Sequence, residues 1–226
     1  MTPKITLYTA APSQNAVRPE LALLEKGLPF RKVQVDLFGG EHKQPPFGKI
    51  TPRRQVPTLV YGEGDQAITV YESVAITQFI DDMHPQPPLM PLVSQPALRA
   101  KALMRLAEFQ QKLDPKNIFG SVVFRKQTRE QLGERVDALL EELSRWDGYV
   151  GEGPFLCGDQ FTLADIAVFP LLMHFEAIGY DYAKHTPSLF KYMNQCKARP
   201  SVVQSGWIGN FNAFVRDRNP ARVLAD

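Results

Sequence analysis

The chain has 226 residues, of which 44% are hydrophobic and 22% charged, and its formal net charge is +2. These values are typical of a folded globular protein with enough length for one large domain or two small ones. The low net charge and the scattered basic residues give no reason to expect a nucleic-acid partner.

The cysteines and the apolar runs bear on location and on metal binding. The opening residues, MTPKITLYTA, lack the apolar core of a signal peptide, and the longest apolar run, 166–173, is too short to span a bilayer. Cys157 and Cys196 are too few for a disulfide framework and have no metal-ligand spacing. We therefore expect a cytoplasmic protein with no metal and no membrane partner.

Residues 1–84 alternate between strand and helix patterns. After a short strand near 4–8, apolar residues recur from Val17 to Leu28 at helical spacing, and the pattern stops at Gly27 and Pro29. Pro19 falls early in this helix, so we expect an irregular first turn. The remaining segments predict a strand at 30–37, a polar connection with one helical turn at 41–50, a tight β-hairpin at 58–71 and a helix at 72–84.

Residues 85–96 contain five prolines and no regular period, which is typical of a linker. All later patterns are helical, over 97–125, 129–146, 162–178 and 186–197 and near the C-terminus. One helix start is well specified, because Thr162 and Asp165 form a capping box and Phe161 and Ile166 a hydrophobic staple. The sequence thus predicts a mixed α/β domain at 1–84, a linker at 85–96 and an all-helical domain at 97–226.

Pro57 raises a question, because it stands just before a predicted strand in RRQVPTLV. Proline has no N–H for a strand ladder, so it marks either a sheet edge or a turn that aims backbone groups at something else. The order β-α-β-(α)-β-β-α with Val-Pro before the third strand resembles a thioredoxin-like fold. With an all-helical domain appended, the chain resembles a cytosolic glutathione transferase over essentially its full length.

The motifs DLFGGEHKQPPF, QVP and YESVAITQFI, in this order and spacing, are most similar to the serine-type phi class, with theta next. The resemblance implies a cis bond before Pro57 and a glutathione site formed by His42, Lys43, Gln55, Val56, Pro57, Glu72 and Ser73. In it, Val56 pairs with the peptide as an added strand would, and the helix start at Glu72-Ser73 attracts the γ-glutamyl carboxylate. Read alone, Glu72-Ser73 is also an ordinary helix cap, and His42-Lys43 a solvated charged pair.

Ser13 stands between the first strand and the first helix, where the resemblance puts a catalytic serine. A hydroxyl that donates to sulfur beside a helix N-terminus lowers the pKa of the glutathione thiol. Two alternatives remain open: Ser13 is only a helix N-cap, or Tyr8, near the end of the first strand, is the catalytic hydroxyl as in other classes.

The resemblance also implies an electrophile pocket between the domains, for which we predict Ala11, Phe38, Phe119, Val123 and Phe124. These apolar side chains fit a core equally well. The predicted function is conjugation of the glutathione thiolate to apolar electrophiles, with glutathione as co-substrate, reduction of hydroperoxides as a second activity, and a homodimeric assembly. The alternative is a module of the same fold that binds glutathione, another ligand or a protein without catalysis, and a turnover assay separates the two.

Overall fold

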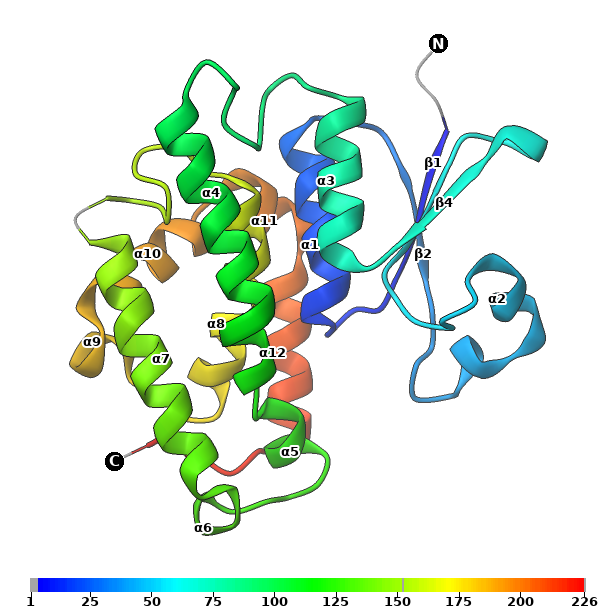
Figure 1. Cartoon of the computed structure of the whole chain (residues 1–226). Coiled ribbons are helices and arrows are strands. Elements are labelled where there is room, and N and C mark those ends of the chain that lie inside the picture. The colour runs from blue at the N-terminus through cyan, green and yellow to red at the C-terminus, as the bar shows by residue number, and fades with distance from the viewer. Residues whose placement is uncertain (1–3, 152, 226) are drawn as a thin grey trace.

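The computed structural model describes residues 4–151 and 153–225, which form a small α/β domain beside a larger helical domain (Figure 1). The first domain contains β1 Ile5–Thr9, α1 Gln14–Glu25, β2 Arg31–Gln34, α2 Pro45–Ile50, β3 Thr58–Tyr61, β4 Ile68–Tyr71 and α3 Ser73–Met83. The second contains α4 Pro96–Glu108, α5 Phe119–Val123, α6 Arg129–Leu132, α7 Glu134–Val150, α8 Leu163–Ala177, α9 Tyr182–His185, α10 Pro187–Lys197, α11 Pro200–Ser205 and α12 Trp207–Arg218.

The four strands form one sheet in the order β2-β1-β3-β4, with β1 parallel to β2 and the other pairs antiparallel. Figure 1 shows α1 and α3 on the face toward the helical domain and α2 on the opposite face. Ile5, Leu7 and Leu59 are buried against the helices because alternate side chains of a strand point to the same face. The predicted thioredoxin-like domain followed by an all-helical domain is confirmed.

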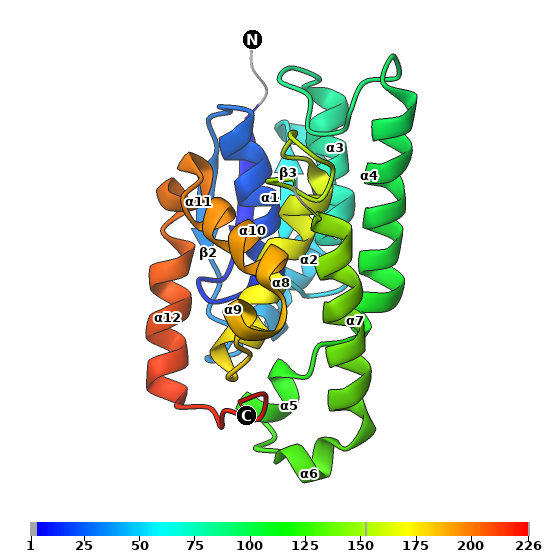
Figure 2. The same cartoon turned by 90° about the vertical axis from the view of Figure 1, so that its left-hand side faces the viewer.

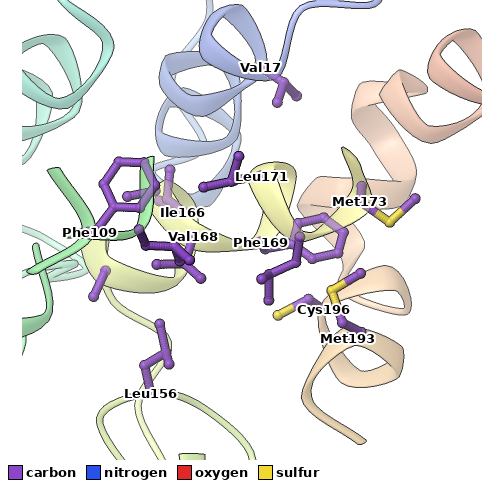
Figure 3. Packing of buried hydrophobic residues seen from close by; sticks show 14 of the residues in the cluster. Val17, Phe109, Leu156, Ile166, Val168, Phe169, Leu171, Met173, Met193 and Cys196 are labelled. Atoms are coloured by element: carbon purple, nitrogen blue, oxygen red, sulfur yellow. The ribbon is translucent and has the colours of Figure 1, made fainter. Parts of the chain in front are cut away.

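Helix α8 is the centre of the helical domain. Figure 2 shows it between α12 on one side and α4 and α7 on the other. Every residue from Leu163 to Phe175 is buried, so this part of the helix is enclosed on all sides, although it contains the polar side chains of Asp165 and His174. Figure 3 shows its side chains in one hydrophobic cluster with Val17 of α1, Phe109, and Met193 and Cys196 of α10.

The predicted capping box begins α8. The Thr162 Oγ1 accepts a hydrogen bond from the Ala164 N–H at 3.3 Å, and the Asp165 carboxylate accepts from the Thr162 N–H at 2.7 Å. Asp165 also accepts from the Leu156 N–H at 2.9 Å, which ties the preceding loop to the helix. Complete burial raises the pKa of Asp165 from 3.8 to about 6, an effect that these hydrogen bonds oppose.

Several predicted boundaries are wrong. The helix expected over 97–125 ends at Glu108 and is followed by a π-helical turn at Phe109–Leu113, a 3-10 turn at Asp114–Lys116 and α5. The helix expected from 129 breaks at Gly133, where φ is +51° and a residue with a side chain is disfavoured. The connection between β3 and β4 is longer than a tight turn and contains a 3-10 turn at Gly64–Gln66.

The proline-rich segment after α3 is packed rather than loose. The buried carboxylate of Asp81 accepts from the Leu89 and Met90 N–H groups at 2.8 and 2.9 Å. It also pairs with the buried Lys26, whose Nζ lies 2.5 Å from Asp81 Oδ1 and donates to the Pro87 carbonyl. The segment thus fixes the start of the helical domain on α1 and α3. None of the described helices is long and apolar enough to cross a bilayer.

Candidate glutathione and electrophile site

A cavity of about 640 Å³ lies where the two domains meet. Its walls come from the β1–α1 turn, the loops after β2 and before β3, the β4–α3 junction, and helices α5, α8 and α12. Eleven of the residues named from the sequence line it: Ser13, Phe38, His42, Lys43, Gln55, Val56, Pro57, Glu72, Ser73, Phe119 and Phe124. Segments far apart in the chain therefore meet at one site with a polar part and an aromatic part.

Ser13 is the N-cap of α1. Its Oγ accepts a hydrogen bond from the Ala16 N–H at 3.3 Å, so its own O–H proton is left to donate elsewhere. The helix itself runs through Pro19 as one continuous segment from Gln14 to Glu25. Ser13 therefore combines an available donor with the positive end of a helix dipole, both of which stabilise a nearby anion.

Tyr8 lies elsewhere. It belongs to β1, its ring packs edge-on against Phe47 of α2 with centroids 5.9 Å apart, and it is absent from the described lining of the cavity. This geometry favours Ser13 over Tyr8 as the hydroxyl that reaches a ligand in the cavity.

The peptide bond between Val56 and Pro57 is cis. Within the described part of the chain, neither the N–H nor the C=O of Val56 has a hydrogen-bond partner. Both groups belong to a residue that lines the cavity, so an extended peptide can pair with them.

The N-terminus of α3 faces the same cavity through Glu72 and Ser73. No side chain caps this helix and its first turn contains no acid, so its first N–H groups are available to an anion. Glu72 has φ +69°, a conformation that non-glycine residues rarely adopt and that often marks functional sites. The arrangement can bind a carboxylate at the N–H groups and an ammonium at Glu72.

The polar part of the cavity is rich in cations. His42, Lys43, Arg53 and Arg54 line it, and Glu72 is the single acid among its described lining residues. Arg54 Nη1 donates to the Lys43 carbonyl at 3.1 Å, which links the loop before β3 to the 3-10 turn at Glu41–Lys43. His42 Nδ1 is buried without a partner. This charge pattern suits a ligand that carries two carboxylates.

Arg18 lies beneath the polar part and is 2% exposed. Its Nη1 donates to Asn15 Oδ1 at 2.7 Å and to Ser73 Oγ at 3.1 Å, and its Nε donates to the Ala167 carbonyl of α8 at 3.0 Å. Burial lowers the pKa of Arg18 from 12.5 to about 10, while Asp114, 3.7 Å from Nη2, opposes that shift. Arg18 thus connects the start of α1, the start of α3 and the central helix of the other domain.

Three of the four phenylalanines that line the cavity pack together and form the aromatic part. Phe38 stacks on Phe214 with centroids 5.9 Å apart and an interplanar angle of 18°, and Phe124 lies 6.5 Å from Phe38 and 6.2 Å from Phe214. Phe38 and Phe124 are 61% and 56% exposed, which is unusual for large apolar side chains and typical of a binding surface. The Arg218 guanidinium lies 4.9 Å from the Phe38 ring centroid.

Two predicted pocket residues do not line the cavity. Val123 is 2% exposed and belongs to the hydrophobic core. It precedes Phe124, and neighbouring residues of a helix point in different directions, so only one of the two reaches the cavity. Ala11 lies in the β1–α1 turn outside the lining, which begins at Pro12.

Other lining residues were missed from the sequence, chiefly Asn15, Asn117, His174 and Phe214. His174 is in a wholly buried helix, where periodicity gives no functional face. For Asn117 a signal existed, because Asp114-Pro115 marks a helix boundary just before it. No group of three or more His, Cys, Asp or Glu side chains in the described chain is placed to hold a metal ion.

Comparison with known proteins agrees with this geometry. Residues 12–83 match the N-terminal domain of glutathione S-transferases, and residues 84–200 match their C-terminal domain. The chain is 30% identical to glutathione S-transferase 1 of Dianthus caryophyllus over 191 residues, which cover 81% of this chain and 83% of the relative. It is 27% identical to a stringent starvation protein A homolog of Coxiella burnetii over 207 residues, 89% of this chain and 90% of that one.

Among solved structures, a glutathione S-transferase from the Antarctic clam Laternula elliptica superposes with a TM-score of 0.79. The sequences are 27% identical, and the match covers 91% of this chain and 94% of the clam protein. Both domain matches, the curated relatives and the fold lead to one conclusion: the chain is an enzyme of the glutathione S-transferase family.

Proposed function

We propose that this enzyme binds glutathione in the polar part of the cavity and transfers its thiolate to apolar electrophiles held in the aromatic part. The single observation that carries the proposal is that one cavity, with Ser13 among its lining residues, contains both the polar part rich in cations and the exposed aromatic part. These two parts are called the polar wall and the aromatic wall below. We assign the chain to a serine-type class, most similar to phi, with theta next.

Glutathione fits the polar wall group by group. The free backbone groups of Val56 pair with the cysteinyl residue, as an added strand would. The γ-glutamyl carboxylate meets the uncapped start of α3 at Ser73, and its ammonium meets Glu72, with the Gln55 amide beside them. The glycyl carboxylate meets His42 and Lys43.

Ser13 is the residue that activates the thiol. At neutral pH a free thiol with a pKa near 8.5 is only a few per cent ionised. The Ser13 O–H donates to the sulfur, and the N-terminus of α1 adds a positive dipole, so the thiolate is favoured. The thiolate then attacks the electrophile and a carbon–sulfur bond forms. In a substitution the leaving group departs with its bonding electron pair; in an addition the displaced electron pair shifts within the electrophile, which then takes a proton from water.

Reduction of organic hydroperoxides is a second reaction open to the same thiolate. The thiolate would attack the peroxide oxygen, the O–O bond would break and release an alcohol, and the resulting sulfenic acid would react with a second glutathione to give a disulfide and water. One observation favours the non-catalytic alternative. The chain is similar to the stringent starvation protein A homolog of Coxiella burnetii, whose name is not that of a transferase. The intact Ser13 and polar wall favour the enzyme.

The proposal is tested by calorimetric titration with glutathione and by conjugation assays with a panel of apolar electrophiles. Glutathione binding with turnover supports it. Binding without turnover of any electrophile supports the module instead, and absence of glutathione binding refutes the assignment of the polar wall.

We also propose a homodimer. β4 is an edge strand with Ile68 and Tyr71 exposed, and large apolar side chains of neighbouring helices are exposed too, namely Met83 on α3 and Leu103 and Met104 on α4. An uncovered edge strand together with exposed apolar side chains is typical of a surface that a partner covers. The cytoplasmic location stays a prediction, consistent with two cysteines that are buried and unpaired.

A further inference from the structure

His174 is a titratable side chain that the proposed chemistry has not used. It lies on α8, is 7% exposed and lines the cavity beside the aromatic wall. Its ring is held between two phenylalanine rings, stacked on Phe119 with centroids 4.0 Å apart and on Phe211 with centroids 5.2 Å apart. The plane of the imidazole is therefore fixed.

The neighbouring amide of Asn117 sets the tautomer of this imidazole. Asn117 Oδ1 accepts a hydrogen bond from the Phe119 N–H at 3.0 Å, so the amide NH₂ is the group that faces His174. Asn117 Nδ2 lies 3.4 Å from His174 Nδ1. Because Nδ2 only donates, Nδ1 is the acceptor and the ring proton is on Nε2.

The imidazole is also neutral. Burial, and then the charge of Arg18, lowers the pKa of His174 from 6.5 to about 3. A neutral ring with an accepting Nδ1 leaves Nε2–H as a donor.

That donor faces the cavity. Nε2 has no hydrogen-bond partner within the described residues, yet it is not among the polar atoms that are both unpartnered and closed off from solvent. Since the residue lines the cavity, its accessible nitrogen opens there. An oriented N–H in an otherwise aromatic wall is a specificity element, because it rewards a ligand with an acceptor at that point.

We infer that His174 Nε2–H donates a hydrogen bond to the oxygen of the electrophile, and that the preferred substrates are apolar α,β-unsaturated carbonyl compounds. The inference rests on the proposed function. When the glutathione thiolate attacks the β-carbon, a C–S bond forms, the C=C electron pair shifts, and negative charge develops on the carbonyl oxygen. A proton from water then reaches the α-carbon. A fixed donor at the oxygen stabilises the charge as it develops.

The test compares two apolar electrophiles that both carry a phenyl ring, benzylideneacetone, which develops charge on oxygen, and benzyl chloride, which releases chloride. The measured quantity is the kcat/KM for benzylideneacetone divided by the kcat/KM for benzyl chloride, both with glutathione. His174→Phe keeps an aromatic ring between Phe119 and Phe211 but removes the donor, and this ratio should fall at least about ten-fold. His174→Gln keeps an N–H donor and should restore a large part of the ratio.

The outcomes distinguish the role of His174 from the proposed function. If the wild type conjugates both probes and His174→Phe leaves the ratio unchanged, the role of His174 is refuted while the proposed function stands. If the wild type conjugates neither probe, the proposed function fails and the inference fails with it. Thermal melting shows whether each variant has folded, and His174→Leu replaces His174→Phe if that variant has not.

Discussion

Replacing Ser13 by alanine tests the catalytic assignment most directly. The substitution removes the hydroxyl that donates to the thiolate in our proposal, while the polar contacts of the rest of glutathione remain. A hydrogen bond to a charged group contributes about 1.5–3 kcal/mol, equivalent to a shift of roughly one to two units in the pKa of the bound thiol.

The effect on rate follows from the ionised fraction. With a bound thiol pKa of about 6.5, roughly three-quarters of the glutathione is thiolate at pH 7; with a pKa of about 8.5, roughly 3% is. Conjugation by Ser13→Ala at pH 7 should therefore fall by a factor of about 25 and recover as the pH rises toward 9. The dissociation constant of glutathione should change little.

The structure adds a second effect that the experiment must separate. Ser13 Oγ also caps α1 through the Ala16 N–H, and loss of an N-cap costs about 0.5–2 kcal/mol of stability. Ser13→Thr keeps both the hydroxyl and the cap and is the matched control. Stopped-flow titration of the thiolate absorbance against pH measures the bound pKa without turnover.

Tyr8→Phe is the rival variant. Because the Tyr8 ring packs on Phe47 outside the cavity lining, this change should leave the pH profile where it is. A profile displaced by Tyr8→Phe and untouched by Ser13→Ala would refute our reasoning and make Tyr8 the catalytic hydroxyl.

Three further predictions concern binding, stability and assembly. Ser73→Ala should weaken glutathione binding by about 1–3 kcal/mol in calorimetry, and an unchanged affinity would contradict the placement of the γ-glutamyl carboxylate. Asp165→Asn should lower the free energy of unfolding by about 1–3 kcal/mol, because an amide cannot accept from both the Thr162 and Leu156 N–H groups. Because burial raises the pKa of Asp165 to about 6, ionisation of this carboxyl lowers the stability of the wild type as the pH rises through 6. The difference in unfolding free energy between the wild type and Asp165→Asn, measured in urea, should therefore be largest below about pH 4 and shrink across that range. Light scattering should give twice the 25.5 kDa of one chain, and the mass of a single chain would rule out the homodimer.

The polar wall could be predicted from the sequence because its residues stand at chain landmarks. Ser13 follows a strand and precedes a periodic helix, Ser73 opens another helix, and Val56-Pro57 interrupts a strand pattern. At such junctions the local chain has free backbone groups, and these are what an anionic peptide binds. The identity of the expected ligand came from the resemblance to a family, and the structure showed that these residues line one cavity.

The aromatic wall could not be predicted in the same way. Phe124 and Val123 are both apolar and adjacent, and only the breaks around α5 decide which one is exposed. Those breaks depend on tertiary packing, which overrides the continuous helical period of 97–125. His174 has no local signal at all, since its role depends on Asn117, 57 residues earlier in the chain.

Arg18 connects the two walls of the cavity through hydrogen bonds to both domains. Its guanidinium donates to Ser73 at the start of α3 and to the Ala167 carbonyl of α8, the helix that also bears His174. A buried cation without partners is energetically unfavourable, and this favours conformations in which Arg18 keeps its hydrogen bonds to both of these groups. In the proposed function, the glutathione end and the electrophile end of the cavity are thereby both connected to one side chain. Small rearrangements between the domains should consequently disturb substrate binding and thiol chemistry together rather than one at a time.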